Sequence, residues 1–139
     1  MEQVLLKKEK KYDTYRIRKK LLEKLLQGEN LILQELRSQY KNSTVSREFT
    51  GVGFFTDFNV HNCKPIANGK YFQIGDINAF IDGDDSKIGF ILFIKNGFLS
   101  LLEGYTISLN EWPEEYNNIV LKYNDNDIRD LEELRKIWA

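Results

Sequence analysis

The chain has 139 residues, of which 42% are hydrophobic and 29% charged, and its net charge is −1. This length predicts one domain, residues 1–139, and the lone Cys63 excludes an internal disulfide and favours a reducing compartment. The apolar runs are far shorter than the roughly 20 residues of a membrane-spanning helix. No apolar run follows the basic residues in 1–11, as a signal peptide would require. Both observations predict a cytoplasmic protein without membrane contact.

The N-terminal part of the chain, up to residue 42, contains no proline and carries a helical pattern. Apolar side chains at three- and four-residue spacing predict an amphipathic helix; they are Ile17, Leu21, Leu22, Leu25 and Leu26. Gly28 suits the end of this helix, and Asn30 suits the cap of a second one. We therefore expect an N-terminal helical hairpin, with residues 1–16 as a frayed basic extension.

After these helices the apolar residues alternate, which is typical of strands. Residues 45–60 predict one strand with a bend or bulge at Gly51 and Gly53. Residues 71–81 predict another strand, and a loop lies between the two.

The dipeptide Asn96-Gly97 separates two hydrophobic runs. A two-residue type I′ turn needs positive φ at both central positions, which asparagine and glycine adopt most readily. Residues 88–95 and 98–106 are therefore predicted to pair as an antiparallel hairpin.

The C-terminal part predicts a short edge strand at Ile119–Tyr123 and a closing helix over 128–138, with Asp127 near its start. Runs of strands set apart from helices indicate an α+β fold. We expect an N-terminal helical hairpin, an antiparallel meander-like sheet of about 4–6 strands and a C-terminal helix.

Motifs for metal binding, cofactor binding or catalysis are missing from the sequence. His61 and Cys63 could supply two ligands, but a structural zinc site needs four. Residues 82–85 lack the closing glutamate of a calcium loop, and Gly51-x-Gly53 lacks the third glycine of a dinucleotide fingerprint. We expect no catalytic residue, no metal and no cofactor.

Charge is distributed unevenly along the chain. Residues 1–47 carry 12 Lys or Arg and 6 Asp or Glu, a net of +6, whereas 48–139 carry 8 and 15, a net of −7. The basic cluster near the N-terminus could contact phosphates, but a pI of about 5.9 argues against a dedicated nucleic-acid binder. The acidic remainder is expected to steer basic partners.

Three carboxylates, Asp57, Asp76 and Glu103, interrupt runs that otherwise have the composition of a core. If one sheet face is open, they could gather there beside Tyr105 as an acidic, aromatic binding surface. Arg47 is the nearest basic residue by sequence and is expected to serve one of them. The alternative is that Glu103 simply points to solvent on an ordinary strand.

The chain contains the segments REFTGVGFFT (47–56), GD (75–76), GFILF (89–93), LEGYT (102–106) and WP (112–113). With these motifs it resembles a group of small, mostly uncharacterised bacterial single-domain proteins, over most of the chain after residue 20. The resemblance implies a bacterial single-domain protein and brings no activity or catalytic residue with it.

Three functions follow as hypotheses. The first is a non-catalytic protein-interaction module, such as an inhibitor or immunity-type protein, that binds a basic partner through an acidic, aromatic sheet face. The second is a small-molecule-binding protein or enzyme with a cleft near Arg47, Asp57 and Glu103. The third is weak nucleic-acid binding by the basic N-terminal helices.

Overall fold

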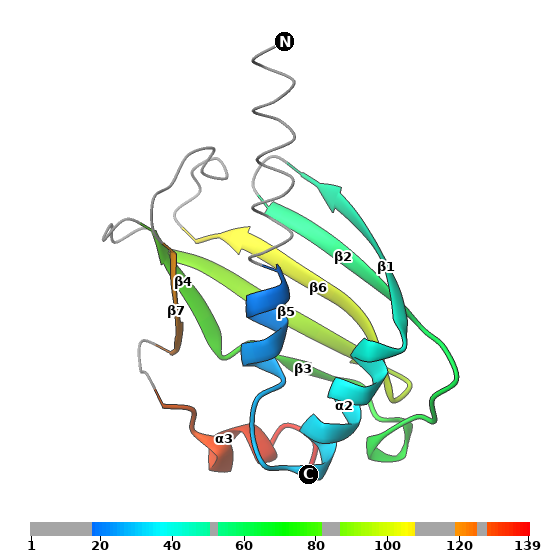
Figure 1. The fold of residues 1–139 in the computed structure, drawn as a ribbon. Coiled ribbons are helices and arrows are strands. Elements are labelled where there is room, and N and C mark those ends of the chain that lie inside the picture. The colour runs from blue at the N-terminus through cyan, green and yellow to red at the C-terminus, as the bar shows by residue number, and fades with distance from the viewer. Residues whose placement is uncertain (1–17, 51–52, 82–86, 108–118, 125–127) are drawn as a thin grey trace.

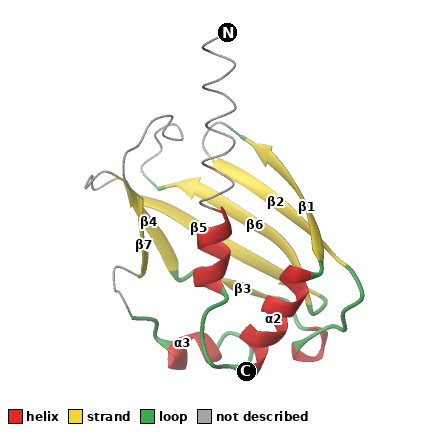
Figure 2. Ribbon diagram, in the orientation of Figure 1, coloured by secondary structure: helices red, strands yellow, loops and turns green. Residues whose placement is uncertain are grey.

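The computed structural model describes residues 18–50, 53–81, 87–107, 119–124 and 128–139. Within these residues, one antiparallel sheet of seven strands carries helices on one of its faces (Figure 1). Figure 2 separates the two layers by colour, with the helices in front of the strands. The predicted α+β class is therefore confirmed.

In the described part of the chain, two helical segments precede the sheet. The first covers 18–25 among the described residues, and the second, α2, covers Leu31–Lys41. Gly28, with φ +141°, lies in the connection, and the Asn30 side chain accepts a hydrogen bond from the main-chain N of Ile32 at 2.9 Å. Both local predictions are thus confirmed. The two helices diverge from this connection in Figure 1, so the predicted helical hairpin is not confirmed.

The strands of the sheet are β1 (Ser43–Phe49), β2 (Gly53–Val60), β3 (Phe72–Ile74), β4 (Ile77–Ile81), β5 (Lys87–Lys95), β6 (Phe98–Thr106) and β7 (Ile119–Tyr123). Their spatial order is β1-β2-β6-β5-β4-β7, and β3 also pairs with β5. Because β6 inserts between β2 and β5, the sheet is not a simple meander. The predicted edge strand at Ile119–Tyr123 is confirmed as β7.

The single strand predicted over 45–60 is wrong, because the structure divides it into β1 and β2. Phe49 pairs with Phe54 across an antiparallel register, and the main-chain N of Thr50 donates to the carbonyl of Gly53 at 3.0 Å. Apolar alternation continues on both sides of this reversal, so the periodicity alone could not reveal it. Residues 51–52 lie outside the described part.

An extra residue separates β3 from β4. Ile74 pairs with Leu92 and Asn78 with Gly89, so four steps along β3–β4 match three steps along β5. A bulge of this kind allows Ile74 and Ile77 to face the same core although they are three residues apart. Asp76 lies in the bulge.

The hairpin predicted around Asn96-Gly97 is confirmed, with φ of 54° and 81° at these two residues. The C-terminal helix, α3, covers Leu131–Arg135 and is shorter than predicted. Its cap is Asp130, whose side chain accepts from the main-chain N of Glu133 at 3.1 Å. Asp127, residues 82–85 and Pro113 lie outside the described part.

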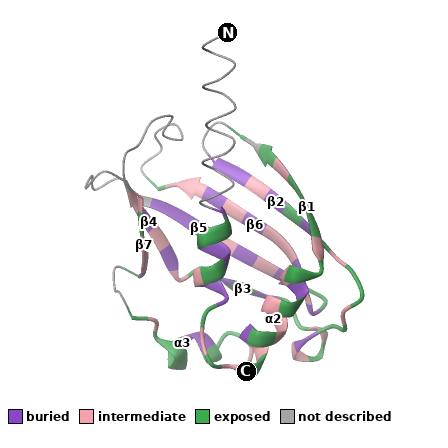
Figure 3. Cartoon of the chain, viewed as in Figure 1, coloured by how far each residue is buried: buried purple, intermediate pink, exposed green. Residues whose placement is uncertain are grey.

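The core lies between the sheet and the helices (Figure 3). The helices contribute five fully buried leucines, Leu21, Leu22, Leu25, Leu33 and Leu36, which meet aromatic and aliphatic side chains of the sheet. Removing each such side chain from water contributes about 1.5–3 kcal/mol. The buried Gln39 of α2 bonds both the carbonyl of Gly97 and the main-chain N of Leu99 at 2.9 Å, which ties the helix to the hairpin turn.

Candidate functional site

The face of the sheet opposite the helices carries a mixed apolar and acidic surface. On β2, Phe54, Thr56 and Phe58 are buried, so the alternating residues project to the other side. The same alternation holds on β5 and β6. We define the open face by these residues: Phe55, Asp57, Ile91, Phe93, Leu101, Glu103 and Tyr105. Asp57 is exposed and the other six are partly exposed.

Glu103 lies near the middle of the open face. Its strand, β6, is internal to the sheet, and its direct cross-strand neighbours are Phe55 on β2 and Ile91 on β5. Asp57 pairs with Leu101, which places it diagonally from Glu103, at about 7–8 Å between strand positions. Two carboxylates therefore lie among apolar side chains that remain in contact with water.

Tyr105 lies over a glycine on the same face. It pairs with Gly89 across β5 and β6, and a Cβ atom on Gly89 would lie 2.5 Å from Cζ and 2.6 Å from Oη of Tyr105. On the core face, the ring of Phe54 covers Gly104 in the same way. These two glycines belong to the GFILF and LEGYT segments, and their lack of a side chain is what lets the aromatic rings lie across the sheet.

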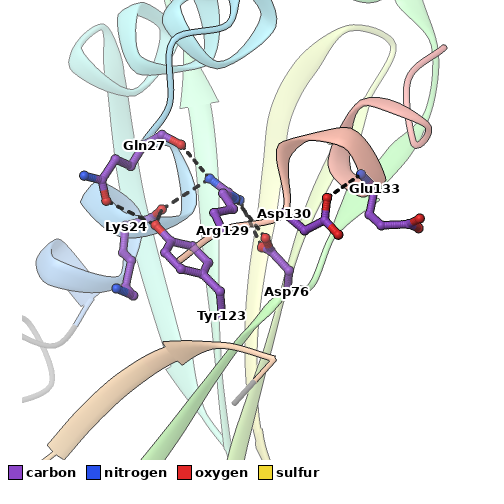
Figure 4. A network of polar contacts seen from close by, with 7 residues as sticks. All are labelled: Lys24, Gln27, Asp76, Tyr123, Arg129, Asp130 and Glu133. Atoms are coloured by element: carbon purple, nitrogen blue, oxygen red, sulfur yellow. Dashed lines mark hydrogen bonds and ion pairs between the residues drawn. The ribbon is translucent and has the colours of Figure 1, made fainter. Parts of the chain in front are cut away.

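Asp76 does not belong to the open face. Its carboxylate forms a bidentate ion pair with Arg129, with nitrogen–oxygen distances of 2.8 and 2.9 Å (Figure 4). The Arg129 side chain is 6% exposed and that of Asp76 is 16% exposed. Arg129 also donates to the carbonyls of Gln27 and Lys24, at 2.8 and 3.3 Å. Asp76 is therefore occupied by a structural contact, and no sequence pattern marks Arg129 as its partner.

Tyr123 completes this network. Its hydroxyl donates to the carbonyl of Lys24 at 2.7 Å, and its ring lies 4.3 Å from Nζ of Lys24 and 5.0 Å from the guanidinium of Arg129. Burial raises the pKa of the Tyr123 hydroxyl above its ordinary value; the nearby Arg129 opposes this increase and Asp76 reinforces it. The network joins the end of the first helix, the bulge and the chain before α3.

Arg47 lies on the opposite side of the sheet from Asp57 and Glu103. It pairs with Thr56, which is fully buried against the helices, whereas Asp57 pairs with Ser46. Burial lowers the pKa of the Arg47 guanidinium, and the neighbouring Arg18 lowers it further. The structure thus brings Asp57, Glu103 and Tyr105 to one face and leaves Arg47 and Asp76 elsewhere.

Among the clefts lined only by described residues, two lie next to the helices. One, of about 570 Å³, lies between the sheet and α3, and its lining includes Ile91, Tyr105, Asp130 and Glu133. The other, of about 850 Å³, lies at the helix connection around Gly28. Arg47, Asp57 and Glu103 line neither, so neither is the cleft expected around those three residues.

The remaining candidate ligands show only ordinary contacts. Nε2 of His61 lies 3.2 Å from Oγ1 of Thr44, and Cys63 is partly buried. In the described part of the chain, no group of three or more His, Cys, Asp or Glu side chains is arranged to hold a metal ion. The helices described there include none that is both long and apolar enough to cross a bilayer.

Comparison with protein-family models finds none that matches this chain, and searches of curated proteins and of solved structures likewise return no match. The resemblance to small bacterial proteins therefore stays a prediction.

Proposed function

We propose that this protein is a non-catalytic interaction module that binds a basic partner protein through the open face. An inhibitor or immunity-type role is a specific form of this proposal. The observation that carries it is the position of Glu103, a carboxylate on an internal strand, flanked by Phe55 and Ile91 on the face opposite the first helix and α2.

The apolar content of the open face supports binding to a macromolecule. Phe55, Ile91, Phe93 and Leu101 are large side chains that keep part of their surface in water. A contiguous apolar patch rimmed by polar groups is typical of a protein-binding surface. Aromatic residues are also the usual anchors of such surfaces, because each buries a large area at small cost in side-chain entropy.

The charge of the open face favours a basic partner over a second copy of the chain. Asp57 and Glu103 are its charged members, and both are acidic. Two identical faces packed against each other would bring these carboxylates together, and like charges in direct opposition are destabilising. A partner with lysine or arginine residues at matching positions would instead gain attraction and faster association.

A small-molecule function receives less support. Ligand sites are concave and enclose most of the ligand surface. Asp57 and Glu103 lie on the surface of a sheet, and Arg47, the third residue of the expected cleft, lies on the other side. A reaction that uses these three groups together has no geometric basis here.

Site-specific photo-crosslinking tests the proposal. The photoreactive amino acid p-benzoylphenylalanine is placed at Phe55 or Phe93 of the open face, and, as a matched control, at the exposed Gln34 of α2. After irradiation of cells that produce the protein, adducts are identified by mass spectrometry. We expect the same basic protein from both open-face positions and not from Gln34. Glu103→Lys in the same background should abolish the adduct, because it reverses the central charge.

Adducts that are equally strong from Gln34, or an adduct unaffected by Glu103→Lys, would contradict the proposal. If the crosslinked protein is this protein itself, the partner of the open face is a second copy of the chain and not a basic protein. Size-exclusion chromatography with light scattering checks that outcome independently, since a face-to-face dimer would double the mass.

A further inference from the structure

The cleft between the sheet and α3 is continuous with the open face. Ile91 and Tyr105 belong to both surfaces, so a partner seated on the open face would reach the entrance of the cleft. Its volume of about 570 Å³ lies within the usual range for ligand sites, about 300–1,000 Å³. It therefore has room for one long side chain and the main chain that carries it.

The walls of this cleft combine apolar and acidic groups. Ile128 is 84% exposed and Ile137 41% exposed, and both line it together with Ile91. Asp130 and Glu133 also line it, whereas the described lining includes no lysine or arginine. An apolar stem followed by a cationic end group matches this combination.

The two carboxylates keep acceptor capacity for such a group. Asp130 accepts one main-chain hydrogen bond, from N of Glu133 at 3.1 Å, and a carboxylate can accept several. Glu133 pairs at 2.8 Å with Lys136, whose side chain is 71% exposed, so a competing cation can displace this contact at low cost. The planar guanidinium of arginine, with five donors, can engage two carboxylates at once.

We propose that this cleft receives an arginine side chain of the partner protein, with its aliphatic stem against Ile128 and Ile137 and its guanidinium at Asp130 and Glu133. The proposal rests on the proposed function, because the open face delivers the partner to the cleft. It adds a specific anchor residue on the partner and a second binding element on this chain.

The test uses a defined probe, N-acetyl-arginine methylamide, titrated into the ¹⁵N-labelled protein and followed by NMR. The matched control probe is N-acetyl-citrulline methylamide, which has nearly the same shape and no charge. We expect the arginine probe to shift the amide signals of Tyr105 and of Asp130 to Leu134. We expect the citrulline probe to bind at least about fivefold more weakly, because it lacks the charge-assisted hydrogen bonds.

Charge-removing variants locate the guanidinium. Asp130→Asn retains a good helix cap, and Glu133→Gln retains the side-chain length. Each should weaken binding of the arginine probe about two- to fivefold, the range of an exposed ion pair. Glu132→Gln is the matched control, because Glu132 lies on the same helix but does not line the cleft, and it should leave binding unchanged.

Equal affinity for the two probes overturns the arginine assignment, and so does an Asp130→Asn, Glu133→Gln double variant that binds the arginine probe normally. Neither result affects the crosslinks from Phe55 and Phe93. The arginine assignment would then be wrong while the proposed function still stands. Conversely, loss of those crosslinks with selective binding of the arginine probe would overturn the proposed function while supporting the chemistry of the cleft.

Discussion

The guanidinium of Arg129 binds the carboxylate of Asp76 through two hydrogen bonds, Nε to Oδ2 at 2.8 Å and Nη2 to Oδ1 at 2.9 Å. Its third nitrogen, Nη1, donates to the carbonyl of Gln27 at 2.8 Å. Main-chain N of Asn124 donates to the carbonyl of Asp76 at 2.9 Å. One arginine thus links the bulge between β3 and β4 to the end of the first helix and holds the chain that leads into α3.

Arg129→Ala should lower the free energy of unfolding by about 3 kcal/mol, because removing one partner of a largely buried ion pair leaves the other charge uncompensated. Urea denaturation measures this change. Arg135→Ala is the control: Arg135 is 64% exposed and lies 3.7 Å from Glu132, so its loss should cost less than about 0.5 kcal/mol. Equal effects of the two substitutions would show that the network does not hold the C-terminal segment.

Gly89→Ala should destabilise the protein by about 1 kcal/mol, because the added methyl group overlaps the ring of Tyr105, which must shift. In a Tyr105→Ala background the same change should cost less than about 0.5 kcal/mol, since the ring is gone. A double-mutant cycle from urea denaturation gives the coupling between the two sites. Additive effects would mean that the ring does not lie over Gly89.

Gly97→Val should destabilise by at least about 2 kcal/mol, for two reasons. The φ of 81° is unfavourable for a β-branched residue, and a Cβ atom there would lie 2.6 Å from the carbonyl oxygen of Ile66. Asn96→Gly, where glycine accepts the φ of 54°, should change stability by less than about 1 kcal/mol. Thermal unfolding followed by circular dichroism compares the stability of the two variants. A Gly97→Val variant as stable as the original protein would contradict the tight turn.

Tyr123 should cause part of the protein's loss of stability at alkaline pH. The pKa of Tyr123 is raised in the folded state. Its contribution to the free energy of unfolding is therefore complete below about pH 10, the ordinary pKa of tyrosine. It is lost as the pH rises through the folded pKa, since the unfolded chain releases its proton first. Urea denaturation at pH 8 and at pH 11 measures how far the free energy of unfolding declines between these values, and Tyr123→Phe should remove the part of the decline that comes from Tyr123. At pH 8 the same substitution should lower the free energy of unfolding by about 1 kcal/mol, because a hydrogen bond is lost. In Tyr71→Phe, a change at an exposed tyrosine, the decline should persist.

Glu103→Gln should leave the free energy of unfolding within about 0.5 kcal/mol of the original value, because the side chain is partly exposed. Affinity for the crosslinked partner should fall about two- to fivefold, and added salt should weaken binding of the original protein more than that of the variant. Calorimetric titration and a melting curve measure both quantities. A large fall in the melting midpoint would instead identify Glu103 as a structural acid and remove it from the binding surface.

Several features were predictable because their signals lie in consecutive residues. Asn96-Gly97 tolerates positive φ, Gly28 and Asn30 suit the connection between two helices, and Ile119–Tyr123 has the composition of a strand. Each is a local preference of the chain and needs no distant contact. For β6, alternation linked only neighbouring residues: if Leu102 faced the core, Glu103 would face away from it, and the structure buries Leu102 completely.

The arrangement of those elements depended on contacts between distant residues. The strand predicted over 45–60 became two, because pairing β1 with β2 satisfies the main-chain hydrogen bonds of both, and alternation is the same in one strand or two. Asp57 and Asp76 looked alike in the sequence, yet the bulge turned Asp76 toward Arg129, 53 residues away, while Asp57 stayed in water. Which carboxylate is free to bind depends on which one finds a buried counter-ion, and only the packed chain brings that counter-ion within reach.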